Sequence, residues 1–249
     1  MLGVLCGCAE RLSAQQREWL NQGQDCYERG DWVRAIDYLS RFLAEVREGP
    51  AATRALYLRG ASNAEAGRRS QAYVDLLNCV RGAPHPEAVW RAYVALGTLH
   101  FEERKWDYAA QDYRAAAERM PGGPPKDYVL VRRAICLERA GQWVAARDCW
   151  GQIVREFPAG RYGELAARRL SLGADHFAVQ CGAFRDRANA DRLCRELMDK
   201  GLEASVQTEA QKRTPLYVVV VGRYADFDEA ERHLAMIKER YVKDAVLWP

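Results

Sequence analysis

The sequence lacks any apolar run of the roughly 18–20 residues that a helix needs to span a bilayer. It also lacks a strong charge of one sign, because its 249 residues carry 37 basic and 34 acidic side chains. Residues 175–249 alone carry 12 basic and 13 acidic side chains. A domain whose affinity comes from neutralising phosphates is strongly basic, so we expect no nucleic-acid partner.

Clustered metal ligands and catalytic motifs are missing too. The four histidines and eight cysteines are scattered, and no CxxC or zinc-finger spacing occurs. HExxH, GxSxG and glycine-rich phosphate loops are absent as well. We therefore expect no catalytic residue, no metal site, no cofactor and no enzymatic activity. We interpret His100 as structural, and Cys26 and Cys79 as core residues because they fall on helix-packing positions.

The N-terminus contains Leu5-Cys6-Gly7-Cys8, which resembles a bacterial lipobox. The resemblance implies that Cys8 is lipidated and attaches the protein to a membrane. A secretory signal has a basic start and an apolar stretch of about 7–15 residues, and the sequence shows neither in full. Two interpretations of residues 1–14 stay open: a shortened lipoprotein signal, or a terminal tail with two cysteines.

A repeat of 37 residues fills the first two thirds of the chain. Its turns stand at Gly30-Asp31-Trp32, Gly67-Arg68-Arg69, Arg104-Lys105-Trp106 and Gly141-Gln142-Trp143. Small residues before and after each turn let two helices approach closely. The pattern predicts helices near 16–29, 32–46, 52–66, 69–81, 87–103, 106–119, 127–140 and 143–157, with a capping helix near 160–172.

The third unit shows the pattern best, with Tyr93-x2-Leu96-Gly97-x2-His100, then Ala109-x3-Tyr113, then Pro121. It resembles the tetratricopeptide repeat (TPR), which implies that residues 15–173 form an α-solenoid. Such repeats bind peptide segments or partner domains on their concave face. By family geometry, the candidate partner-binding residues are Gln24, Tyr27, Thr98, Phe101 and Arg139.

After residue 174 the periodicity changes. Alternating residues predict strands at 176–181, 203–208, 216–221 and 245–247, and helical periodicity predicts helices at 187–200 and 228–240. The order β-α-β-β-α-β predicts a small α+β sandwich over residues 174–249.

This segment resembles the SPOR domain, in the stretches 177–184, 188–190, 197–201, 216–224 and 228–230. The resemblance implies binding of peptidoglycan glycan strands that have lost their stem peptides, through the exposed face of the sheet. The candidate glycan-binding residues are Ala178, Gln180, Leu216, Val218, Val220 and Arg223.

The third predicted strand departs from the family, which often carries a basic residue where this sequence has Val218. Its run of four valines indicates that both faces of the strand are at least half covered. Two interpretations stay open: an apolar platform that faces the sugar, or a face covered by the repeats or by the 209–215 loop.

The resemblances together predict a non-enzymatic protein of the bacterial periplasm or cell envelope, anchored to the outer membrane if it is lipidated. Its SPOR domain would bind peptidoglycan and its repeats would recruit an unknown protein partner, in cell division or wall remodelling. The alternative is an outer-membrane assembly or scaffold lipoprotein whose SPOR domain no longer binds glycan. RNA recognition shares the β-α-β-β-α-β order but needs aromatic residues on the central strand, where this sequence has valines.

Overall fold

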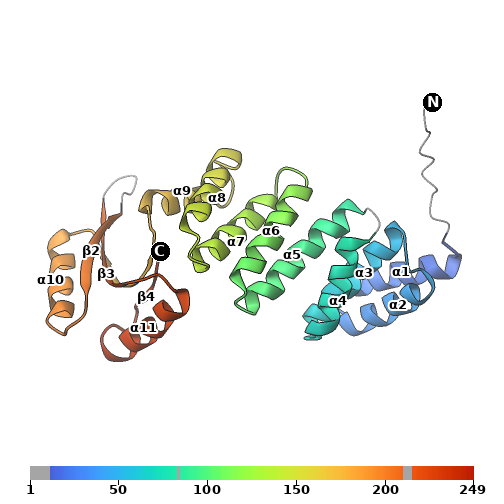
Figure 1. Ribbon diagram of the computed structural model, residues 1–249, viewed down its shortest axis with the longest axis horizontal. Coiled ribbons are helices and arrows are strands. Elements are labelled where there is room, and N and C mark those ends of the chain that lie inside the picture. The colour runs from blue at the N-terminus through green and yellow to red at the C-terminus, as the bar shows by residue number, and fades with distance from the viewer. Residues whose placement is uncertain (1–11, 83–84, 210–214) are drawn as a thin grey trace. The chain divides into compact units, whose positions relative to one another are not determined.

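The computed structural model describes residues 12–82, 85–209 and 215–249, and its elements are labelled in Figure 1. Cys8, the predicted lipidation site, lies outside these ranges. The helices before the sheet are α1 (Ala14–Glu28), α2 (Trp32–Glu45), α3 (Pro50–Glu65), α4 (Arg69–Arg81), α5 (Pro86–Glu102), α6 (Trp106–Arg119), α7 (Lys126–Arg139), α8 (Trp143–Glu156) and α9 (Gly163–Leu172). The remaining elements are β1 (Phe177–Phe184), α10 (Arg187–Met198), β2 (Ala204–Glu209), β3 (Leu216–Tyr224), α11 (Phe227–Arg240) and β4 (Val246–Trp248).

The predicted fold class, helical hairpins of the TPR type followed by a β-α-β-β-α-β module, is confirmed. The helix and strand ends all agree with the predicted ranges to within three residues. The capping helix starts later than expected, at Gly163, because residues 158–162 form turns. The backbone N–H of Gly160 bonds the carbonyl of Phe157, and that of Gly163 bonds the carbonyl of Gly160.

Within a hairpin, a small residue of the first helix contacts a large residue of the second helix. A Cβ atom built on Gly23 would lie 2.6 Å from Cγ of Leu39, and one built on Gly97 would lie 3.0 Å from the Tyr113 ring. Leu39 and Tyr113 are fully buried. The recurring small residue is therefore required because the two helices of a hairpin touch at that point.

The described chain divides into two compact units between Gly122 and Gly123. The N-terminal unit holds α1–α6, and the C-terminal unit holds α7–α9 together with the sheet and its two helices. The predicted domain boundary between residues 173 and 174 stays a prediction, and within the C-terminal unit the helices before it pack with the module after it.

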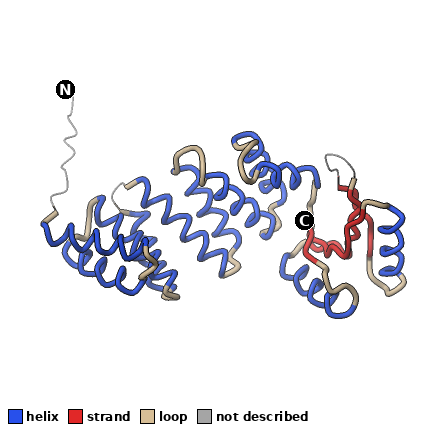
Figure 2. Tube along the Cα trace, turned by 180° about the vertical axis from the view of Figure 1, so that it is seen from behind, coloured by secondary structure: helices blue, strands red, loops and turns tan. Residues whose placement is uncertain are grey.

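The sheet is antiparallel, with strand order β2-β3-β1-β4, and it is strongly curved (Figure 2). Helices α10 and α11 pack on one of its faces with Ala190, Leu197, Ala230 and Ile237 buried. The central strand β3 is buried on both faces, since all four valines from Val218 to Val221 are at most 2% exposed. The predicted covering of both faces is confirmed.

The predicted core cysteines are confirmed as well. Cys26 and Cys79 are buried and unbonded to another cysteine. Burial raises the pKa of the Cys79 thiol to about 12. The thiol therefore stays protonated at neutral pH and behaves as a small apolar side chain.

Two adjacent leucines of α4 test the packing of the hairpins. Leu76 is fully buried against the small-residue contact at Gly60, whereas Leu77 is 38% exposed. We expect Leu76→Ala to lower the free energy of unfolding by about 2–5 kcal/mol, measured by urea denaturation. Leu77→Ala is the matched control and should cost less than about 1 kcal/mol. Equal losses would contradict the assigned packing.

Candidate functional site

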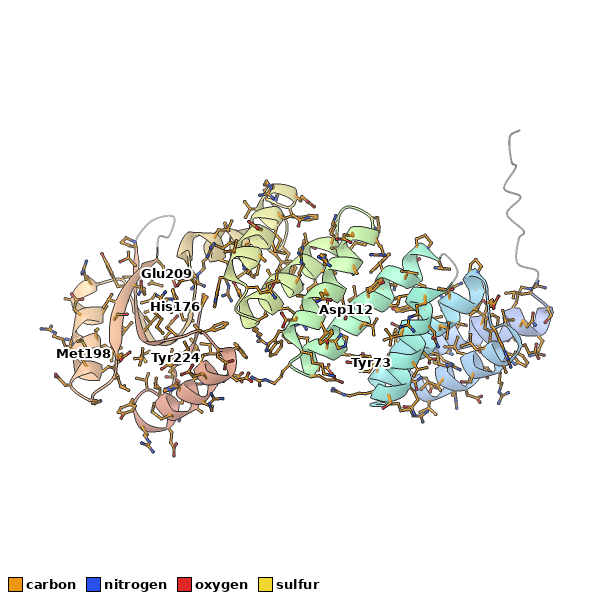
Figure 3. The ribbon with its side chains drawn as sticks, viewed as in Figure 1. Tyr73, Asp112, His176, Met198, Glu209 and Tyr224 are labelled. Atoms are coloured by element: carbon orange, nitrogen blue, oxygen red, sulfur yellow. The ribbon has the colours of Figure 1, made fainter. Side chains whose placement is uncertain are left out.

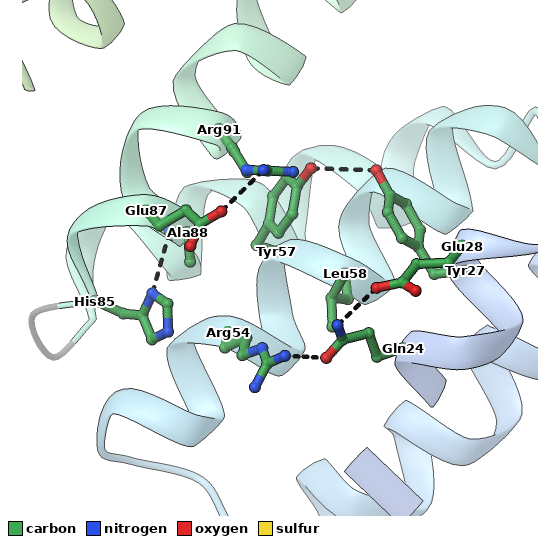
Figure 4. Close-up of a pocket in the computed structure, with 10 residues that line it drawn as sticks. All are labelled: Gln24, Tyr27, Glu28, Arg54, Tyr57, Leu58, His85, Glu87, Ala88 and Arg91. Carbon is green, nitrogen blue, oxygen red and sulfur yellow. Dashed lines mark hydrogen bonds and ion pairs between the residues drawn. The ribbon is translucent and has the colours of Figure 1, made fainter. Parts of the chain in front are cut away.

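A groove of about 420 Å³ lies on the N-terminal unit (Figure 4). Its walls come from α1, α3 and α5, the first helices of three successive hairpins, and these are the helices expected to line a partner-binding face. The groove is lined by Gln24, Tyr27, Glu28, Arg54, Tyr57, Leu58, His85, Glu87, Ala88 and Arg91.

Two tyrosines form an aromatic wall of this groove. The hydroxyl oxygens of Tyr27 and Tyr57 lie 3.1 Å apart, and the two rings meet edge to face with centroids 6.2 Å apart. Burial, together with the neighbouring Tyr57 phenol, raises the pKa of Tyr27. The Tyr27 phenol therefore stays neutral and offers a hydrogen-bonding group on an apolar ring, a combination that suits peptide recognition.

The charged side chains of the groove are only partly neutralised. Arg91 pairs with Glu87 at 2.8 Å, and Gln24 donates to Glu28 at 2.7 Å. Arg54 donates to the side-chain oxygen of Gln24, which is a neutral amide. The guanidinium of Arg54 thus presents a positive charge next to Gln24, where a carboxylate can accept from it.

The predicted partner-binding residues do not all meet in this groove. Gln24 and Tyr27 line it. Thr98 instead bonds the carbonyl of Val94 at 3.0 Å and the Tyr113 hydroxyl at 3.1 Å, so it ties α5 to α6.

The other two predicted residues contact aromatic rings. Phe101 packs edge to face on Trp106, with centroids 5.1 Å apart. Arg139 belongs to the C-terminal unit, where its guanidinium lies 4.3 Å from the centroid of the Phe227 ring in α11. The role of these residues in partner binding stays a prediction.

Arg54 and Arg91 were not among the residues predicted from the sequence, although the sequence holds a signal for them. Arg17, Arg54 and Arg91 stand 37 residues apart, so they occupy the same position in three successive repeats. A cation that recurs with the period of the repeat lies on the same face of each first helix. Tyr57 has no such signal, because its equivalents in the other repeats are Leu20, Val94 and Val131.

The fourth hairpin packs against the sheet module. In the first and third repeats a tryptophan that begins the second helix contacts an aromatic residue of the first, as Trp32 does with Tyr27 at 5.6 Å. The fourth repeat has Glu138 in place of that aromatic residue, and Trp143 packs instead on Phe177 of β1, 4.8 Å away. Phe177 therefore supplies the aromatic contact that the repeat itself lacks.

The predicted glycan-binding residues fall into two groups by exposure. Ala178, Val218 and Val220 are at most 1% exposed and form one cluster with Trp248. Leu172 at the end of α9 and Ala174 of the following linker pack on that cluster. The structure thus shows the second face of the sheet covered, as one of the two open interpretations expected.

Gln180, Leu216 and Arg223 keep part of their surface exposed, although Leu216 also packs on the cluster. Gln180 and Leu216 are half-buried, and the Arg223 side chain is 64% exposed. Arg223 donates to both carboxylate oxygens of Asp175 at 2.8 and 2.9 Å. A hydrogen bond from His176 and the charge of Arg223 lower the pKa of Asp175.

A buried carboxylate marks the covered face. Glu209 at the end of β2 is 3% exposed and lies on the side of the sheet towards α9 (Figure 3). It accepts hydrogen bonds from Arg168 of α9 at 2.9 and 3.2 Å and from the indole N–H of Trp248 at 3.1 Å. Burying a carboxylate is costly unless it is paired, so this contact depends on the cation that α9 supplies.

Comparison with known families agrees with these features. The SPOR domain family matches residues 173–248, and the tetratricopeptide repeat family matches residues 128–159. The chain therefore carries a SPOR domain, a domain of the peptidoglycan-binding type, and at least one tetratricopeptide repeat. Both are binding modules rather than catalytic ones. No curated protein matches the chain in sequence.

Among solved structures, a tetratricopeptide repeat protein from Parabacteroides merdae is similar at 16% identity and a TM-score of 0.54, covering 76% of this chain and 68% of its own. A structure of the protein MamA is similar at 16% identity and a TM-score of 0.49, covering 65% of this chain and 88% of its own. At such low identity the first of these supports the repeat fold alone.

The described residues show neither a membrane-spanning helix nor a metal-binding cluster. Within residues 12–82, 85–209 and 215–249, no helix combines the length and the apolar character that a membrane crossing needs. The same part of the chain holds no group of three or more side chains placed to bind a metal ion.

The contact between Trp143 and Phe177 gives a testable prediction. We expect Trp143→Ala to speed amide hydrogen exchange in β1, because the removed indole exposes Phe177. Trp106→Ala, at the same position of the third repeat, is the matched control and should speed exchange in α5 and α6 instead. Unchanged exchange in β1 of Trp143→Ala would show that the fourth hairpin does not support the sheet.

Proposed function

We propose that this is a non-enzymatic protein of the bacterial envelope that binds denuded glycan strands through its SPOR domain and a protein partner through its helical repeats. The match of the SPOR family to residues 173–248 carries the proposal. Its setting is cell division or wall remodelling. Lipid attachment at Cys8, which lies outside the described residues, would hold the protein at the outer membrane.

The glycan site is assigned to the sheet face that holds Gln180. Gln180 lies opposite Val220, and Val220 lies opposite Ser205, so the three residues form one row across three strands. Ser205 is exposed and Gln180 is half-buried. Their amide and hydroxyl groups can hydrogen-bond sugar hydroxyls at the part of this face that is still open.

The partner site is assigned to the groove of the N-terminal unit. Arg54 lines the same groove as the Tyr27–Tyr57 pair, and together they suit a peptide segment that carries a carboxylate and an apolar side chain. The predicted residues Gln24 and Tyr27 are part of this assignment.

One observation favours the alternative function, a scaffold whose SPOR domain no longer binds glycan. Three of the six predicted glycan-binding residues, Ala178, Val218 and Val220, are buried beneath Leu172, Ala174 and Trp248. Under this alternative the cover is permanent and the protein acts through its repeats alone.

Sedimentation with cell-wall sacculi tests the glycan site. We expect the full-length protein to pellet with sacculi, and more so after an amidase has removed the stem peptides. Gln180→Ala should weaken pelleting about threefold to tenfold, because a lost hydrogen bond costs about 0.5–1.5 kcal/mol. Gln15→Ala, an exposed residue of α1, is the control and should pellet like the wild type. No pelleting on either kind of wall would support the scaffold alternative.

Peptide titration tests the groove. We expect short peptides with acidic side chains and a free C-terminus to bind the protein, with Arg54→Ala weakening their binding about tenfold to a hundredfold, since a charged hydrogen bond is worth about 1.5–3 kcal/mol. Arg41→Ala is the control, because Arg41 is exposed on α2 and pairs with Asp37 outside the groove. Two results would contradict the assignment of this groove as the partner site. One is that Arg54→Ala binds the acidic peptides as well as the wild type does, and the other is that the wild type binds neutral amidated peptides equally well.

A further inference from the structure

Part of the cover of the sheet comes from outside the SPOR match. Arg168 and Leu172 belong to α9, which ends one residue before the SPOR match begins. Leu172 packs on the cluster of Ala178, Val218, Val220 and Trp248. The sheet face on which the glycan site is assigned is therefore occupied by a helix of the repeat region.

The contact between α9 and the sheet has a polar part as well as an apolar part. In the polar part the carboxylate is buried, whereas the guanidinium is exposed. Glu209 is 3% exposed on its own strand, whereas the side chain of its partner Arg168 is 54% exposed. The two N–H groups of Arg168 and the indole of Trp248 account for the hydrogen bonds given to this carboxylate. If α9 moves away, Glu209 regains water, so the charge does not have to stay unpaired in the open state.

The linker between α9 and β1 is bound by side chains of α8 and of β3. Arg147 of α8 reaches the carbonyl of Ala174 at 3.4 Å, and Arg223 of β3 pairs with Asp175 at 2.8 Å. His176, the next residue, packs its ring on Trp248 at 5.8 Å. Residues 173–176 thus lie in a fixed path beside the covered face.

We propose that α9 and the linker at residues 173–176 form an autoinhibitory cover, and that a glycan strand competes with this cover for the same face of the sheet. This inference rests on the proposed glycan-binding function. In the closed state the strand meets only the open row at Gln180 and Ser205. Release of Arg168 from Glu209 lets Leu172 and the linker leave the cluster of Val218, Val220 and Trp248, and more of this face then becomes available.

The test uses the full-length protein and Arg168→Glu, which removes the cation and places a second carboxylate against Glu209. A site that is open in only a small fraction of molecules loses apparent affinity by that fraction. We therefore expect Arg168→Glu to bind amidase-treated sacculi roughly tenfold more tightly than the wild type. Leu172→Ser, which removes the apolar part of the cover without a charge change, should act in the same direction.

Two control variants separate the cover from general charge effects. Arg168→Lys keeps the positive charge and should bind like the wild type. Arg155→Glu makes the same charge change at an exposed position of α8 and should also bind like the wild type. If Arg155→Glu and Arg168→Glu both bind amidase-treated sacculi more tightly than the wild type and to the same extent, the proposal is overturned.

Hydrogen exchange without any glycan separates this inference from the proposed function. Arg168→Glu and Leu172→Ser should speed exchange at residues 173–176, and unchanged exchange in both would overturn the cover. If both variants exchange faster at the linker but bind sacculi only as tightly as the wild type does, the competition between cover and glycan is overturned, whereas the proposed glycan site still stands. Faster exchange with no binding by any variant overturns the proposed glycan binding itself.

Discussion

The structure of the C-terminal unit depends on a strand that is buried on both faces. Each of the four valines from Val218 to Val221 is at most 2% exposed, so β3 needs a layer on either side. Helices α10 and α11 supply one layer. Among the described residues, the second layer includes Trp248 from the neighbouring edge of the sheet and Leu172 and Ala174 from the preceding helix and linker.

This requirement joins the last repeat to the sheet. Trp143 finds its aromatic partner in Phe177, Arg139 lies over Phe227, and Arg168 neutralises Glu209. Each contact pairs a residue of α7–α9 with one of the SPOR domain. The compact C-terminal unit accordingly starts at Gly123 and not where the SPOR match starts, at residue 173.

Local patterns were enough to predict the helices, because the small residues and turns recur every 37 residues within one hairpin. The valine run likewise predicted that both faces of β3 are covered. The identity of the cover was not predictable, since Arg168 and Glu209 stand 41 residues apart and each resembles a solvated surface charge. The lining of the groove was predicted only in part. Gln24 and Tyr27 were predicted as partner-binding residues, whereas Arg54 and Arg91 were not, although they recur with the period of the repeat.

The central claim is that glycan and α9 share one face of the sheet. It is tested most directly by hydrogen exchange of the wild-type protein with and without soluble denuded glycan fragments. The account predicts that the glycan lowers protection at residues 173–176, which leave the face, while β3 stays protected beneath the sugar. Glycan bound with the linker still fully protected would contradict the account, because the ligand would then bind without displacing the cover.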